Sequence, residues 1–249
     1  MPFRVSVTAE TLMNQLFHWL VLVPLSLGLV AGCASGPFIT ATLYDSPAKY
    51  VRLQLDRTVK KGAEHSHPTA LSPEQMAAVL AGVRVIEPVA FVRGDIMEVV
   101  GGELPPPVHP AFTDKEVSFF APLLALALSK ATPEEVVTFY ETRYISAITR
   151  EVTSGGLFIQ GDELHLILAN YRSHTHYMAD LGVAETQDDR LTPMKSMAPQ
   201  EGRLDFEPSS AKRERPVGFW DKLFQWDRRE VVVSFRQLSP RHLVRPDSS

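Results

Sequence analysis

Two histidine pairs are the residues whose spacing most directly suggests chemistry: His65 and His67 flank one serine, and His174 and His176 flank one threonine. Residues two apart in an extended chain point to the same side, so each pair could chelate, and four imidazoles could complete a tetrahedral zinc site. The pairs are more than 100 residues apart, and no further ligand motif accompanies them. We therefore expect exposed loop histidines, with a metal-binding protein as an open alternative and no bound cofactor.

Ser46 and Lys49 match the Ser-x-x-Lys spacing of penicillin-binding proteins and β-lactamases, in which the lysine lies one helical turn from the nucleophile. The residues that follow, 50–56, alternate between apolar and polar types as in a strand. Lys49 would then not lie beneath Ser46 on a helix, so a turn with a solvated lysine is the simpler interpretation. His165 lies between Leu164 and Leu166 and is interpreted as a sheet-surface residue rather than a catalytic base.

Two acid pairs, Asp188-Asp189 and Glu134-Glu135, could be imagined in glycoside hydrolysis. That reaction needs two carboxylates at a fixed separation across a cleft, which adjacency in sequence does not provide. We expect these side chains to be solvated. The sequence also lacks a glycine-rich phosphate loop and a Gly-x-Ser-x-Gly elbow. A non-catalytic protein is favoured, and a hydrolase whose site is assembled from residues distant in sequence is the alternative.

An aromatic segment near the C-terminus is the most unusual local feature. On a helix, Trp220, Leu223 and Phe224 share one face, and the basic run at 212–215 precedes them. Such a face contacts a membrane surface or a partner protein in some proteins. More often it packs on the core, and we expect a helix that closes one side of the sheet.

Composition limits the possible functions. The chain has 249 residues, 45% of them hydrophobic and 22% charged, which is an ordinary globular balance. The formal net charge is −4, and a mildly acidic chain without a basic cluster is a poor nucleic-acid binder. The single cysteine excludes an internal disulfide.

The N-terminal region contains an apolar run over residues 16–31 without Lys, Arg, Asp or Glu. This run is shorter than the roughly 20 residues that a membrane-spanning helix needs, and Pro24 and Gly28 interrupt it. It is typical of the hydrophobic core of a cleaved signal peptide. The run is followed by Gly32 and Cys33, and the four residues Val30-Ala31-Gly32-Cys33 resemble the lipobox of bacterial lipoproteins.

The lipobox resemblance implies the fate of the N-terminus. In lipoproteins a peptidase removes the signal peptide, here residues 1–32, and lipid attached to the new first residue, here Cys33, holds the protein on a membrane. Ala34 stands where an aspartate would retain a lipoprotein in the inner membrane, so the resemblance favours the outer membrane, facing the periplasm. Arg4 is the only Lys or Arg of the expected leader, which leaves both Met1 and Met13 as possible starts.

Local patterns predict an α+β fold of antiparallel hairpins with two or three helices packed on one face. Runs 38–44 and 50–56 predict a hairpin with one dry face. Capping boxes at Ser72 and Thr113 predict two helices, and Pro122 is expected to kink or divide the second.

The middle of the chain gives conflicting signals. Thr132-Pro133-Glu134-Glu135 looks like a helix cap, whereas the β-branched and aromatic run that follows, to Tyr140, favours a strand. We favour a strand over residues 133–142. Further strands are expected at 145–149, 157–160 and 164–169, the last two as a hairpin.

These patterns divide the chain into a signal peptide, a lipidated tether at 33–37 and an α+β domain at 38–186. A linker or loop at 187–202, C-terminal strands with the aromatic helix at 203–238 and a disordered tail at 239–249 complete the layout. The C-terminal elements are expected to pack on the same domain. The function predicted on this basis is a lipid-anchored binding, structural or assembly module of the cell envelope.

Overall fold

A computed structural model describes residues 38–59, 61–62, 64–87, 106–146, 149–176, 189–198, 202–214 and 229–238. All of them belong to one compact unit, residues 37–249. The predictions for Cys33 and for Trp220, Leu223 and Phe224 lie outside the described residues. Neither described α-helix has the length and hydrophobicity of a membrane-spanning segment.

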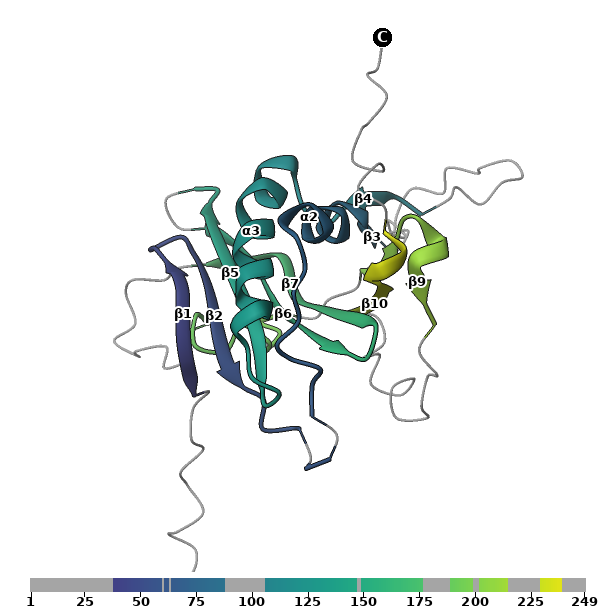
Figure 1. Ribbon diagram of the computed structural model, residues 1–249. Helices are drawn as coiled ribbons and strands as arrows, with labels where there is room; N and C mark the ends of the chain where they lie inside the picture. The colour runs from purple at the N-terminus through teal and green to yellow at the C-terminus, as the bar shows by residue number, and fades with distance from the viewer. Residues whose placement is uncertain are drawn as a thin grey trace, which may run out of the picture. The chain divides into compact units, whose positions relative to one another are not determined.

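Two antiparallel sheets dominate the structure (Figure 1). In spatial order, the larger has seven strands: β1 (Ile39–Asp45), β2 (Lys49–Leu55), β5 (Glu135–Tyr144), β6 (Thr149–Gln160), β7 (Glu163–His176), β10 (Glu230–Ser234) and β9 (Lys212–Arg213). The smaller has three: β4 (Val108–Pro110), β3 (Val83–Ile86) and β8 (Arg203–Phe206). The helical segments are α2 (Pro73–Gly82), α3 (Asp114–Lys130) and the short 3-10 turns η1 (Ser209–Ala211) and η3 (Phe235–Gln237).

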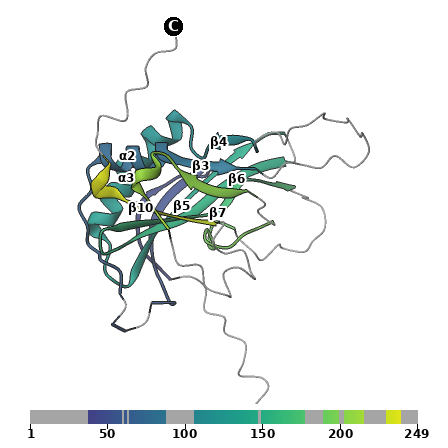
Figure 2. The same ribbon diagram turned by 90° about the vertical axis from the view of Figure 1, so that its right-hand side faces the viewer.

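Helices α2 and α3 cover one face of the seven-stranded sheet, as Figures 1 and 2 show from two directions. The main hydrophobic core fills the space between them, with Met76 and Leu80 from α2, Phe120 and Leu128 from α3, and Phe139 from β5. The predicted α+β class is confirmed in broad terms, although strands predominate over the two helices.

Both capping boxes form as the sequence predicts. The Ser72 and Thr113 hydroxyls each accept from the main-chain N–H three residues later, and the Gln75 and Glu116 side chains accept from the two cap N–H groups. Pro122 does not divide its helix, because α3 continues through it from Asp114 to Lys130. Pro122 is exposed, so its ring does not displace core side chains, but the main-chain hydrogen bond that it cannot donate weakens the helix.

The conflict at residues 133–142 resolves in favour of a strand. The carboxylate of Glu135 accepts from the Thr132 N–H at 2.7 Å, and the Glu135 N–H donates to the Thr132 carbonyl, so the capping signal closes a turn instead of starting a helix. β5 then pairs with β2 and β6. The strand predicted at 145–149 is wrong, because the chain turns there and β6 begins only at Thr149.

We expected only one face of the hairpin formed by β1 and β2 to be buried. This expectation is wrong for β2, because the second face of the large sheet is covered too. Tyr50, Arg52 and Gln54 of β2 are buried there, opposite the core-facing Val51 and Leu53. The loop at residues 189–198 packs on this face: the Ser154 hydroxyl donates to its main chain at Pro193, and the Asn170 amide donates at Lys195.

The strand register defines two ends of this sheet. Phe38 enters β1 at the end where Ile39 pairs with Gln54 and Gln54 pairs with Val136, called the proximal end here. At the distal end Tyr144 pairs with Arg150. Val136 and Tyr144 are eight residues apart in β5, so about 27 Å of strand separates the two ends.

Candidate functional site

A β-bulge near the distal end of β7 builds the candidate site. Val152 pairs with Ser173 and Ser154 with Asn170, so two residues of β7, Tyr171 and Arg172, lie opposite one residue of β6. Arg172 has a φ of 45°, which is a costly conformation for any residue except glycine. Its N–H donates to the Thr153 hydroxyl at 3.3 Å. Bulges redirect side chains, and this one directs both Tyr171 and Arg172 toward the same cavities.

Two adjoining cavities, of about 710 and 350 Å³, share His109, Tyr171 and Arg172 in their walls and together are called the distal groove. The larger cavity lies between β4, the start of α3 and β7, with Phe112 and Val117 on its helix side. These volumes are in the range of small-molecule sites.

Three side chains, Arg143, Arg172 and His174, surround the half-buried carboxylate of Glu151 beside the smaller cavity. The Glu151 side chain is 13% exposed, and both its oxygens accept from Arg143, at 3.1 and 3.2 Å. Arg172 and His174 also face it, each with a nitrogen 3.9 Å from a carboxylate oxygen. Their side chains are 39% and 62% exposed, so Glu151 positions a guanidinium and an imidazole that solvent or a ligand can reach.

The opposite wall of the distal groove carries two carboxylates, Glu87 and Asp114, and one arginine, Arg84, which pairs with Glu207 at 2.8 Å. Glu87 lies 4.0 Å from His109 at the smaller cavity, and both side chains are 51% exposed. Asp114, in the first turn of α3, borders the larger cavity. Between the walls lies Tyr171, half-buried, with the Arg172 guanidinium 5.4 Å from its ring centre. Burial raises the pKa of the Tyr171 phenol, which keeps it neutral.

The two histidine pairs are not brought together. His174 and His176 belong to β7 at the distal end, and only the side chain of His174 is described there. His65 and His67 lie at the proximal end, where their loop bonds to Pro133 and Ile159. No group of three or more His, Cys, Asp or Glu residues is placed to hold a metal ion in the part of the chain that the structure describes.

His65 and His67 are buried, 9% and 5% exposed, which corrects the expectation of exposed loop histidines. His67 accepts the Ile159 N–H at 3.0 Å, and burial, assisted by the neighbouring His65, lowers the pKa of His67 to about 4. His65 meets Asp56 at 3.1 Å, and this hydrogen bond lowers the pKa of Asp56 to about 2. These contacts attach the loop to the proximal end of the sheet, so the role of His65 and His67 is structural.

His165 is also buried rather than on an exposed sheet surface, because its ring stacks on Phe158 with centres 4.6 Å apart. His65 packs on the same Phe158, at 4.3 Å. The Nδ1 atom of His165 lies 2.7 Å from Glu230. The pair therefore anchors β7 to β10.

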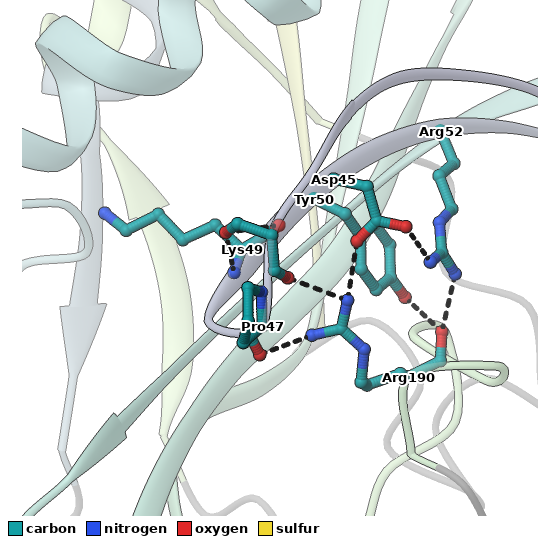
Figure 3. Close-up of polar contacts among 7 residues, drawn as sticks. Asp45, Pro47, Lys49, Tyr50, Arg52 and Arg190 are labelled. Carbon is teal, nitrogen blue, oxygen red and sulfur yellow. Dashed lines mark hydrogen bonds and ion pairs between the residues drawn. The ribbon is translucent and has the colours of Figure 1, made fainter.

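The Ser46 and Lys49 pattern forms a turn, as expected. The Ser46 hydroxyl donates to the Lys49 carbonyl, while the Lys49 ammonium lies 2.8 Å from Glu141. Figure 3 shows the Lys49 side chain extending away from the turn. A serine whose proton is given to a main-chain carbonyl, with its lysine engaged elsewhere, is not an activated nucleophile.

Arg190 fastens the loop at residues 189–198 to this turn (Figure 3). Its guanidinium donates to the Pro47 carbonyl at 2.6 Å and to Asp45 at 2.8 Å. Its own carbonyl accepts from the Tyr50 hydroxyl at 2.6 Å and from Arg52 at 3.5 Å. These hydrogen bonds all join the loop to β2, to the turn before it and to the last residue of β1, so this cluster holds the loop in place.

The acid pairs are not solvated in the way the sequence suggests. Glu135 is 6% exposed within its turn. The Asp189 side chain is 11% exposed, 3.0 Å from Arg150, and accepts from the Tyr140 hydroxyl at 2.8 Å. Glu134 is exposed, and Asp188 lies outside the described residues.

Comparison of the chain with protein-family models, with curated proteins and with solved structures finds no match. The distal groove is therefore interpreted from its own geometry.

Of the groove residues, the sequence singled out only His174. Tyr171 and Arg172 carry no pattern that marks a bulge, because an arginine with positive φ has no glycine or asparagine signature. Glu151 and His109 are isolated in sequence and meet their partners only through strand pairing: β5 with β6 and β6 with β7 for Glu151, and β3 with β4 for His109.

Proposed function

We propose that this chain is a lipid-anchored, non-catalytic binding module of the bacterial envelope, and that the distal groove is its recognition site. The observation that carries the proposal is the position of the groove: it lies at the end of the sheet opposite the entry of Phe38. A protein held by lipid on Cys33 would have a tether of five residues, at most about 17 Å long, before Phe38. The groove would then face away from the anchoring membrane.

The side chains of the groove support binding rather than catalysis. Ser118, the serine of the larger cavity, donates to the Asp114 carbonyl at 2.8 Å instead of to an imidazole. His109 and His174 each face a carboxylate, Glu87 and Glu151, from 3.9 to 4.0 Å. Binding needs positioned charges and an aromatic wall, and the groove provides both without an activated nucleophile.

Photo-crosslinking in cells tests this proposal. A photoreactive amino acid replaces Ser118 at the groove end of α3 or, as the matched control, Lys130 at the other end of the same helix; both positions are exposed. In the lipidated protein, we expect a discrete adduct at position 118, detected as an added mass on the purified protein, and none at position 130. Equal products from both positions, or a product from position 130 alone, would contradict recognition at the groove.

A further inference from the structure

The distal groove carries opposite charges on facing walls. Arg172 projects from β7, whereas Glu87 and Asp114 lie on the wall formed by the end of β3 and the start of α3, where Arg84 is engaged by Glu207. At the smaller cavity, Glu87 and Glu151 are balanced by Arg172 and by Arg143, which bonds to Glu151. A site without net charge but with separated charges is complementary to a ligand that is neutral overall and dipolar.

Arg172 has donors to offer such a ligand. Its ion pair to Glu151 spans 3.9 Å, which is beyond hydrogen-bond length, and 39% of its side chain is exposed. A guanidinium in this state can form a bidentate pair with an incoming carboxylate. The strained φ of Arg172 is consistent with a position held for binding, since such strain persists mainly at functional sites.

Glu87 offers the complementary acceptor. Its distance to His109 is 4.0 Å, and half of its side chain is exposed, so an ammonium group can approach its carboxylate. The smaller cavity, about 350 Å³, is lined by polar side chains and Tyr171, and suits the charged part of a small molecule. The larger cavity combines Phe112 and Val117 with Thr113 and Asp114, a mixture that suits a peptide or amino-acid side chain and disfavours an acyl chain.

We propose that the distal groove binds a small zwitterion of the amino-acid or dipeptide class. Its carboxylate pairs with Arg172, its ammonium group with Glu87, and its side chain extends along the larger cavity. This inference rests on the proposed function as a binding module and specifies the ligand.

Ligand-observed NMR followed by calorimetry tests the inference on the purified mature protein in detergent. The probes are an equimolar mixture of the twenty standard L-amino acids and a mixture of alanyl dipeptides, each also prepared in N-acetylated and C-amidated forms. We expect at least one zwitterion to bind, and either blocking group to weaken it at least about tenfold. Arg172→Gln and Glu87→Gln should each weaken it similarly. Arg236→Gln, at an exposed arginine paired with Asp162, is the control and should bind as wild type.

Absence of binding by every zwitterion at millimolar concentration would overturn the inference, as would blocked forms that bind as well as free ones. A protein that cross-links from position 118 but binds no zwitterion would retain the proposed function and lose this ligand class. Loss of the cross-link at position 118 would instead contradict the proposed function itself.

Discussion

At the scale of single residues, histidines that look equivalent in the sequence differ in how deeply they are buried. His67 is 5% exposed and bonded to the main chain of β6, while the side chain of His174 is 62% exposed in the distal groove. Both belong to a His-x-His pair, and spacing alone contains no information on burial. The sequence therefore identified the residues but not which pair lies near a cavity.

Burial of His67 should make the protein sensitive to mild acid. Its pKa is lowered by burial to about 4 from the ordinary 6.5, so the unfolded chain takes up the proton first as the pH falls. The contribution to stability is complete above pH 6.5 and is lost toward pH 4, by up to roughly 3 kcal/mol. Urea unfolding between pH 7 and 4 should show this decline in wild type and a shallower one in His67→Gln. Identical pH dependence in the two proteins would contradict it.

Replacing Arg172 with glycine rather than alanine should change the free energy of unfolding in the opposite sense from the same replacement at an ordinary strand residue. At a φ of 45°, Arg172→Gly removes the left-handed penalty that Arg172→Ala retains, so the glycine variant should be more stable by about 1 kcal/mol. At Arg143, within β5, glycine should instead be less stable than alanine. Denaturant unfolding of the four variants measures both differences, and a less stable glycine variant at position 172 would refute the strained bulge.

At the scale of elements, α3 contains a proline that weakens it without dividing it. Pro122 is exposed and lacks the N–H that would complete the helical hydrogen bonds. Pro122→Ala should therefore raise the free energy of unfolding by about 1–2 kcal/mol, allowing for the greater freedom of the unfolded chain. The exposed Lys115→Ala on the same helix should change stability by less than about 0.5 kcal/mol. Thermal melts of the two variants measure these changes. An unchanged or lower melting temperature for Pro122→Ala would argue against a continuous α3.

Helix starts and turns could be predicted from the sequence where the residues that define them are neighbours in the chain. The capping boxes at Ser72 and Thr113 and the hairpin turn at Gly161 depend on neighbouring residues, and each forms. The cover on the second sheet face was not predictable, because Arg190 reaches Asp45 across 145 residues of chain. The bulge at Arg172 was missed for the same reason: it is defined by its pairing with β6 and has no signature of its own.

At the scale of the whole molecule, the orientation proposed for the distal groove depends on the N-terminal anchor. The lipobox resemblance at Cys33 predicts that Cys33→Ser abolishes incorporation of fatty acid and blocks cleavage before residue 33. Metabolic labelling with a fatty acid, followed by mass measurement of the purified chain, checks both effects. Continued labelling of the Cys33→Ser protein would show that it is not anchored through this residue.

The most direct test of an anchored module with a distal recognition site is a measurement of its orientation on a membrane. Lipid on Cys33, the single cysteine, would consume its thiol, so a cysteine introduced at Lys61 or Tyr144 would then be the only site for a fluorophore. Lys61 follows β2 near the proximal end, and Tyr144 ends β5 at the distal end, where its side chain is 69% exposed. On vesicles with a headgroup quencher, we predict strong quenching at position 61 and little at position 144. Stronger quenching at position 144 would mean that the distal end rests on the membrane, which would contradict a groove that faces away from it.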